Sequence, residues 1–404
     1  MIVAGGFYKE RCVSPEHNVE FGSGGRAAIA IALAGVDVEW RYYCPKNYQE
    51  IVSQSLSRSN LKHVACESNE TVSFTYFHPL SNPEFTPANP RQCAPIEIKG
   101  ENILRFGFME GTAVVHGDRV VFDPQSPHHP VSFSANGSTA KSLSIILNAK
   151  EALALGRSKT ETKAVERIYK EEGASVIIVK GGAKGCRIYV DGAYTKSVPP
   201  YRTERVYKIG SGDVFSAAFA FHWAEKGLPP EEAADAASRC VARYCNNRLP
   251  SVVLDEDTAA LEAVVLDRKK PGKVYVAGPF FTMAELWLIE EACLALAGLG
   301  VKFFSPYHEA GIIREHTKEE IDRVVAADLK GLDECTALLA VMDGCDPGTV
   351  FEVGYAVRKG IPVVALSQNP KEGDQTMVKG SQRSTITDDF ASAIYRVAWE
   401  SGRK

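Results

Sequence analysis

The chain has 404 residues, of which 45% are hydrophobic and 24% charged, and its formal net charge is -4. This length exceeds the size at which one hydrophobic core usually keeps growing, so we expect two domains. The slightly acidic balance excludes the electrostatic footprint of a nucleic-acid binder and favours small-molecule partners.

Targeting and redox signals point to the cytoplasm. No apolar run is as long as a membrane span, and residues 1–6 fit a first strand rather than a signal peptide with a charged start. We therefore expect no membrane association. The ten cysteines include no Cys-x-x-Cys pair, which argues against a zinc site and a disulfide framework.

The first part of the chain contains a glycine-rich helix start and a β-rich insertion. Residues 1–6 are predicted to form a strand, and residues 21–26 lead into a helix over 27–33. The glycines there, including Gly24, let a ligand approach the backbone, but tight packing of helix against strand explains them equally well. Between residues 60 and 110, β-rich segments alternate with Pro-rich turns, which predicts a small projecting sheet suited to be a lid.

From residue 112, short apolar strands alternate with helices. We expect strands at 112–116, 120–122 and 174–179 and a helix over 140–155. This alternation indicates a mostly parallel sheet covered on both faces, with ligands at the carboxyl ends of its strands. The glycine loop 180–185 and the pair Asn148 and Glu151 fall there. Because Asn148 and Glu151 share a helix face, they predict a site for hydrated magnesium; a solvated helix face is the alternative.

The most informative stretch of this part is residues 207–215, where a glycine-flanked turn opens a long apolar helix. Such a turn leaves backbone N–H groups of Gly210, Ser211 and Gly212 unpaired at the positive end of the helix dipole, which predicts an anion hole. Asp213 at its lip is typical of a base that takes a proton from a hydroxyl attacking a bound phosphate. An aspartate that only caps the helix is the alternative explanation.

Together these motifs resemble the PfkB, or ribokinase-like, family of sugar and nucleoside kinases over residues 1–266. The resemblance rests on the glycine-rich helix start, Asp123-Pro124, Asn148-x-x-Glu151, Lys180-Gly181-Gly182-x-x-Gly185 and Gly210-Ser211-Gly212-Asp213. It implies an α/β sandwich with a small β lid that uses ATP and Mg²⁺. The implied roles are Asp213 as the base, residues 210–212 as the anion hole, Asn148 and Glu151 as organisers of magnesium and phosphate, and Lys180, Gly182 and Gly185 near ATP.

The chain departs from the sugar-kinase pattern at three places. Tyr207-Lys208 stands where the family commonly has Asp-Thr, Arg26 replaces a substrate-gripping Asn, and Glu10 is the nearest match to an Asp that holds sugar hydroxyls. A plain ribose or fructose substrate is therefore disfavoured. Arg26 is suited to stack on a base or bind a carboxylate or phosphate, with a surface salt bridge as the alternative. The lost Asp-Thr leaves open a kinase-like domain that only binds its ligand.

Residues 267–272 are charged, contain Pro271-Gly272 and are predicted to form a linker. After it, over 273–404, we expect strands at 273–281, 301–304, 337–342 and 361–366, and helices at 283–299, 318–332 and 351–358. This pattern predicts a smaller, doubly wound (Rossmann-like or flavodoxin-like) α/β domain with a parallel sheet. It has no GxGxxG or Walker loop, which argues against dinucleotide or P-loop chemistry.

Two acids carry the chemistry of this second domain. Glu352 lies just inside a helix that begins beyond a strand end, where the dipole favours the ionised form that a carboxylate nucleophile needs. Asp346 precedes it by six residues and can face the same side. Paired carboxylates suit glycosyl transfer through an oxocarbenium-like state, and two helix-cap acids are the alternative.

Residues 273–400 resemble the nucleoside 2-deoxyribosyltransferase family, through the Tyr275-x-x-Gly278-Pro279 opening and the acidic loop 343–356. The implied roles are Glu352 as nucleophile, Tyr275 as its orienting partner, Asp346 and Asp328 as groups that hold and protonate the base, and Gly278, Phe280 and Phe281 as substrate contacts whose rings stack on the base. The family also implies a homo-oligomer. Related deoxynucleotide N-hydrolases have a small hydroxyl residue where this chain has Asp346, and a carboxylate there disfavours a phosphorylated substrate.

Two functional hypotheses follow. The first is a bifunctional nucleoside-salvage enzyme, in which one domain phosphorylates a nucleoside or sugar and the other breaks or exchanges an N-glycosidic bond. The second is a nucleoside or nucleotide N-glycohydrolase, of the kind used in stress or phage defence, that is regulated by a degenerate, ligand-binding kinase-like domain.

Overall fold

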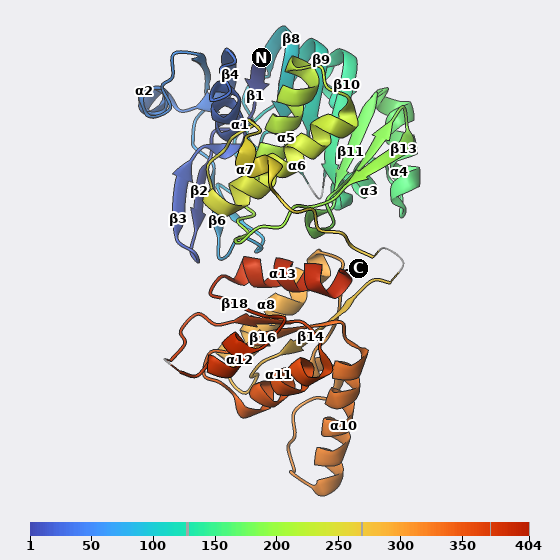
Figure 1. The fold of residues 1–404 in the computed structure, drawn as a ribbon. Coiled ribbons are helices and arrows are strands. Elements are labelled where there is room, and N and C mark those ends of the chain that lie inside the picture. Colours follow the sequence, from blue (N-terminus) through green and yellow to red (C-terminus); the bar gives the residue numbers. More distant parts are fainter. Residues whose placement is uncertain (127–128, 268–269, 372, 404) are drawn as a thin grey trace. The chain divides into compact units, whose positions relative to one another are not determined.

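A computed structural model describes residues 1–126, 129–267, 270–371 and 373–403 (Figure 1). The chain forms two compact units. The first contains Met1–Thr203 and Tyr207–Ala263, and the second contains Glu204–Val206 and Val264–Lys404. Residues 268 and 269 of the predicted linker lie outside the described residues.

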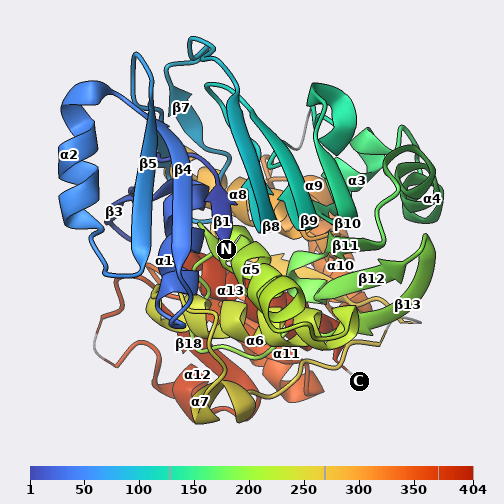
Figure 2. The same ribbon diagram turned by 90° about the horizontal axis from the view of Figure 1, so that it is seen from above.

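The first unit is built on a nine-stranded sheet among the described residues, with the order β13-β12-β11-β10-β9-β8-β1-β4-β5 (Figure 2). Its strands are β1 (Ile2–Ala4), β4 (Val38–Cys44), β5 (Leu61–Glu67), β8 (Ile96–Phe106), β9 (Ala113–Asp123), β10 (Thr139–Asn148), β11 (Val176–Lys180), β12 (Cys186–Val190) and β13 (Ala193–Val198). The pairs from β5 to β11 are parallel, whereas β12 and β13 are antiparallel. Asp123, Asn148 and Lys180 each end a parallel strand, so they share one sheet edge.

Helices cover both faces of this sheet. They are α1 (Gly22–Ala32), α2 (Lys46–Ser55), α3 (Ala149–Leu155), α4 (Glu161–Glu172), α5 (Ser211–Ala220), α6 (Pro230–Asn247) and α7 (Glu256–Ala259). One apolar core joins α1, α5 and α6 to the sheet, and a second core joins α3 and α4 to its other face. The near-continuous apolar strands are explained by this double burial.

A separate four-stranded sheet forms the lid, with the order β3-β2-β6-β7. Its strands are β2 (Lys9–Cys12), β3 (His17–Glu20), β6 (Ser73–Tyr76) and β7 (Glu84–Thr86). The small sheet was predicted from residues 60–110, but half of it comes from residues 9–20. Because β2 brings Glu10 into the lid, the contribution of these early strands matters for the site.

The helix predicted over 140–155 is wrong for its first nine residues. Residues 140–148 belong to strand β10, which pairs in parallel with both β9 and β11. The run Leu143 to Leu147 is fully apolar apart from Ser144, and burial between two strands prevails over helical spacing. The helix α3 begins only at Ala149.

The second unit has a five-stranded parallel sheet among the described residues, in the order β15-β14-β16-β17-β18. Its strands are β14 (Lys273–Ala277), β15 (Lys302–Phe304), β16 (Ala337–Val341), β17 (Val363–Leu366) and β18 (Ser384–Thr387). Its helices are α8 (Met283–Gly298), α9 (Pro306–Glu309), α10 (Lys318–Glu334), α11 (Pro347–Lys359), α12 (Thr376–Gly380) and α13 (Phe390–Gly402). This confirms the predicted α/β class; β18 and α13 were not predicted.

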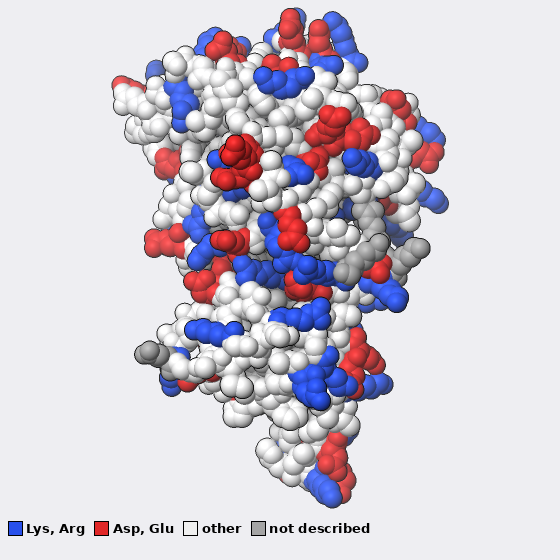
Figure 3. Space-filling view, in the orientation of Figure 1, with Lys and Arg blue, Asp and Glu red and all other residues white. Residues whose placement is uncertain are grey.

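No helix in the described part of the chain has the length and apolar character needed to span a bilayer. On the face drawn in Figure 3, Lys and Arg are interspersed with Asp and Glu over most of the described surface. This mixture of signs accords with the small net charge of -4.

Candidate functional sites

The turn before α5 has the geometry of an anion hole. Gly210 is the N-cap residue and adopts a left-handed conformation with φ of 76°. A Cβ atom on Gly210 would lie 2.3 Å from Cζ of Arg26, so only glycine fits beside this guanidinium. The prediction of an unpaired N–H at Ser211 is wrong, because this group donates to the carbonyl of Lys208 (3.1 Å). The N–H groups of Gly212 and Asp213 have no acceptor among the described residues. These N–H groups are available to an anion.

Asp213, in the first turn of α5, is buried and engaged at both carboxylate oxygens. Arg26 Nη1 donates to Oδ2 at 2.5 Å, and Gln125 Nε2 donates to Oδ1 at 2.6 Å. Burial raises the pKa of Asp213 to about 6, and the Arg26 charge opposes this rise. Asp213 is therefore mostly ionised at neutral pH, as a base requires.

Arg26 connects this aspartate to the lid. Its side chain is 2% exposed, and it bonds to Glu10 of β2 and to the carbonyl of Gly22 as well as to Asp213. The alternative of a surface salt bridge is wrong, because the ion pair is buried. One guanidinium thus holds two carboxylates that lie 203 positions apart in the chain, Glu10 and Asp213.

Gln125 was not predicted as a site residue. It follows Asp123-Pro124 at the end of β9 and has φ of 51°, a left-handed conformation that is uncommon outside glycine. This conformation accompanies the contact between its amide and Asp213. The Asp123-Pro124 motif was the only signal in the sequence that pointed to this loop.

A second polar cluster gathers around Asp123. Lys180 Nζ and Ser216 Oγ both donate to Asp123 Oδ2, each at 2.7 Å. Glu151 lies nearby and is 3% exposed; burial raises its pKa to about 7, Asp123 raises it further and Lys180 opposes the rise. Lys180 therefore neutralises part of a buried acidic group at this sheet edge.

Asn148 and Glu151 form a capping box at the start of α3. Asn148 Oδ1 accepts from the Glu151 N–H (2.9 Å), and Glu151 Oε2 accepts from the Asn148 N–H (2.7 Å). Because Glu151 is buried, the pair is not a solvated helix face. The box occupies Oε2 of Glu151, and the backbone N–H of Ser126 also acts on this carboxylate. Such a site fits a magnesium ion that keeps its water shell and contacts phosphate.

The glycines of the predicted ATP loop and of the first helix have packing roles. A Cβ on Gly185 would lie 2.0 Å from the Val198 carbonyl, so the loop packs against the end of β13. Gly182 and Gly185 both have positive φ. A Cβ on Gly24 would lie 2.2 Å from the Gly5 carbonyl, as the alternative of tight helix–strand packing requires.

In the second unit, Tyr275 and Glu352 are in direct contact. Tyr275 is buried on β14, and its hydroxyl donates to Glu352 Oε1 at 2.6 Å. Burial raises the pKa of Glu352 to about 7; the Tyr275 bond opposes the rise, and Asp328 and Asp346 add to it. One hydroxyl thus orients the carboxylate. The raised pKa contradicts the prediction that the helix dipole favours the ionised form, because Glu352 is the sixth residue of α11 and lies beyond its first turn.

Asp328, on α10, lies close enough to this pair to influence both pKa values. Its Oδ1 atom is buried and has no hydrogen-bond partner among the described residues. Burial raises the pKa of Asp328 to about 6. A buried carboxyl oxygen without a partner is costly, and a ligand that hydrogen-bonds to it would relieve that cost.

Asp346 caps helix α11. Its Oδ2 atom accepts from the N–H (2.8 Å) and the hydroxyl (3.0 Å) of Thr349. The cap accounts for one oxygen, while the charge still acts on Glu352. Asp343 accepts from the N–H groups of Gln368 and Asn369.

The aromatic residues of the predicted base contact form a cluster after β14. The Phe280 ring lies 5.1 Å from Phe281 and 5.6 Å from Tyr307, and Phe281 is 67% exposed. An exposed ring of this kind is available for stacking. Gly278 is required by packing, since a Cβ there would lie 2.7 Å from Ile289 Cδ1.

Two family models match the chain. The pfkB family carbohydrate kinase model matches residues 111–249, and the nucleoside 2-deoxyribosyltransferase model matches residues 274–384. Both predicted resemblances are thereby confirmed: a kinase-like domain of the PfkB, ribokinase-like type precedes a deoxyribosyltransferase-like domain. No curated protein matches the chain significantly.

Several solved structures are similar to the chain. A pyrophosphate-dependent kinase of the ribokinase family, bound to a pyrophosphate analogue and myo-inositol, is 18% identical, with 64% of this chain and 100% of that chain covered and a TM-score of 0.46. Escherichia coli phosphofructokinase-2 with potassium is 14% identical over 64% and 96%, with a TM-score of 0.47. Thermotoga maritima ribokinase is 16% identical over 65% and 95%, with a TM-score of 0.42.

Proposed function

We propose that the protein is a bifunctional nucleoside-salvage enzyme, in which the first unit phosphorylates a nucleoside or its sugar and the second cleaves or exchanges an N-glycosidic bond. The observation that carries the proposal is the presence of two separate reactive carboxylates, Asp213 and Glu352, each held by a specific donor at 2.5–2.6 Å. The family matches support this pairing of a kinase with a transferase.

In the first unit, Asp213 is the base that accepts the proton of the attacking hydroxyl. Arg26 and Gln125 fix its carboxylate, and each oxygen keeps a lone pair for the substrate. The N–H groups of Gly212 and Asp213 stabilise negative charge on the transferred phosphoryl group. ATP with magnesium would supply that group, and Glu151 would hold the metal through its water shell.

In the second unit, Glu352 is the nucleophile that attacks the anomeric carbon, and Tyr275 fixes the oxygen that does not attack. Burial raises the pKa of Asp328 to about 6, and Asp328 passes a proton to the departing base in the fraction of molecules in which it is protonated. A second base or water then releases the glycosyl group from Glu352. The charge of Asp346 favours a substrate without a 5′-phosphate.

The test uses the purified full-length chain with ATP, magnesium and a panel of nucleosides, with ADP formation and base release followed separately. We expect both products. Asp213→Asn should abolish only ADP formation, and Glu352→Gln should abolish only base release. Absence of both products from the wild-type chain would refute the proposal.

A second candidate function is favoured by the engagement of both oxygens of Asp213. In this alternative the first unit binds a ligand without turnover and regulates an N-glycohydrolase in the second unit. Calorimetry with a nucleoside and ATP distinguishes the two: heat of binding without ADP formation supports the alternative. The expected homo-oligomer is checked by light scattering on the same preparation.

A further inference from the structure

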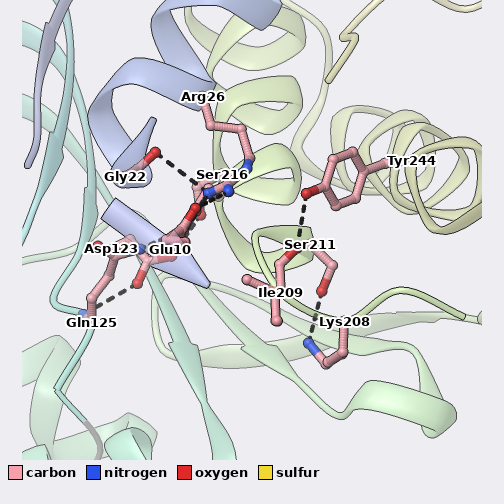
Figure 4. A network of polar contacts seen from close by, with 11 residues as sticks. Glu10, Gly22, Arg26, Asp123, Gln125, Lys208, Ile209, Ser211, Ser216 and Tyr244 are labelled. Carbon is pink, nitrogen blue, oxygen red and sulfur yellow. Dashed lines mark hydrogen bonds and ion pairs between the residues drawn. The ribbon is translucent and has the colours of Figure 1, made fainter. Parts of the chain in front are cut away.

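Lys208 is fixed over the start of α5. Its ammonium Nζ donates to Ser211 Oγ at 2.9 Å, and its carbonyl accepts from the Ser211 N–H at 3.1 Å. Ser211 is the first residue of α5, so two bonds place the lysine at the helix N-terminus (Figure 4). The Tyr244 hydroxyl donates to the next carbonyl, that of Ile209, and this bond fixes the turn before α5.

The charge of Lys208 has no carboxylate partner. Among the described residues, no carboxylate oxygen lies within ion-pair distance of its Nζ. Lys180, by contrast, is paired with Asp123 at 2.7 Å. Burial lowers the pKa of Lys208, and the neighbouring Lys180 lowers it further. A half-buried ammonium beside the positive end of a helix is unfavourable unless an anion joins it.

Lys180 also lies beside the start of α5. Its Nζ lies 3.6 Å from the position that a Cβ on Gly212 would occupy. Two ammonium groups therefore lie beside the first turn of α5, where the N–H groups of Gly212 and Asp213 have no acceptor among the described residues. Phosphate oxygens are the acceptors that match such a set of donors.

We propose that Lys208 is a phosphate-binding residue of this anion hole and that it contacts the phosphoryl group held at Gly212 and Asp213. The inference rests on the proposed function, because it concerns the same anion hole. Under this proposal Lys208 binds phosphate, although Tyr207-Lys208 stands where the family commonly has Asp-Thr. The ligand carries a terminal phosphate, as in a nucleoside triphosphate or inorganic pyrophosphate.

The test is titration calorimetry of the full-length chain with ATP and, separately, with inorganic pyrophosphate, in the absence of any acceptor. We expect Lys208→Met to weaken binding at least tenfold and Lys208→Arg to remain within about threefold of wild type, since arginine keeps the charge. Lys163→Met, at an exposed lysine of α4, is the matched control and should bind as wild type. Thermal melts identify any variant that fails to fold.

The two ligands distinguish the source of the phosphate. An effect on ATP alone indicates a nucleotide, and an effect on both indicates that the polyphosphate itself is recognised. Wild-type affinity in Lys208→Met, or no binding of either ligand by the wild-type chain, overturns the inference. Lys208-dependent binding without ADP formation would instead leave this inference standing and refute the proposed kinase reaction.

Discussion

Arg26 Nη1 lies 2.5 Å from Asp213 Oδ2 in an ion pair whose guanidinium side chain is 2% exposed. The same guanidinium bonds to Glu10, so it neutralises two carboxylates that cannot be solvated. Within the site, Arg26 is a positioning residue: it fixes the proposed base and keeps it ionised. Its loss should affect both the stability of the first unit and the titration of Asp213.

We expect Arg26→Met to destabilise the first unit by about 3–5 kcal/mol, because it leaves two buried carboxylates without a counter-charge. The pKa of Asp213 should rise from about 6, since the Arg26 charge holds it down. Urea unfolding at pH 7 measures the first effect. Arg157→Met is the control: its ion pair with Glu171 is exposed, so its loss should have a much smaller effect on stability. Equal effects would contradict the buried network.

Glu110 is buried beside Tyr8, whose hydroxyl donates to its Oε2 at 3.0 Å. Burial raises the pKa of Glu110 from 4.5 to about 7. Because the folded pKa is the higher one, ionisation of Glu110 costs stability: the cost is absent below pH 4.5, grows as the pH rises and is complete above pH 7.

We therefore expect Glu110→Gln, which keeps an acceptor for Tyr8, to stabilise the protein by up to about 3 kcal/mol at pH 8 and by little at pH 4.5. Urea unfolding at the two pH values measures the difference. A stability gain that does not change with pH would show that Glu110 is already ionised without penalty.

Base release should have a bell-shaped pH dependence. The nucleophile Glu352 has a pKa of about 7 and the proton donor Asp328 one of about 6, so the productive form is most populated between these values. In Tyr275→Phe the bond that lowers the pKa of Glu352 is lost. Because Glu352 has the higher of the two pKa values, the alkaline limb should move to higher pH. Rates of base release from pH 5 to 9 measure the shift; an unchanged limb would contradict the role of Tyr275.

Asp346→Ser separates the two roles of Asp346. Serine also caps helices, so the stability of α11 should change by less than about 0.5 kcal/mol, whereas Asp346→Ala should cost about 1 kcal/mol. Loss of the negative charge should raise kcat/KM for a nucleoside 5′-phosphate relative to the nucleoside. The ratio of the two kcat/KM values is the measurement. No change in this ratio would remove the argument for an unphosphorylated substrate.

The sequence was sufficient where a motif is local. The glycine turn 210–213 before a helix is read from neighbouring residues, and the structure contains it. Asn148 and Glu151 were expected to share a helix face, whereas the structure shows them as a capping box. The helix over 140–155 failed because spacing within one segment does not reveal that β10 is buried between two parallel strands.

Contacts between segments that are distant in the chain could not be predicted from the sequence. The pairing of Asp213 with Arg26 and Gln125 joins three elements, and a single sequence does not reveal which of them meet. The Tyr275–Glu352 contact was expected only because the family resemblance implied it. In the sequence, Lys208 was noted only because Tyr207-Lys208 stands where the family commonly has Asp-Thr. Its bond to Ser211 became apparent only in the structure.

The central claim is that one chain carries two independent reactive carboxylates. The most direct measurement is parallel assay of ADP formation and base release in wild type, Asp213→Asn and Glu352→Gln. The account predicts that each variant loses one activity by at least a thousandfold and keeps the other within about twofold, in line with the loss of a base or nucleophile. Loss of both activities in either variant would contradict it.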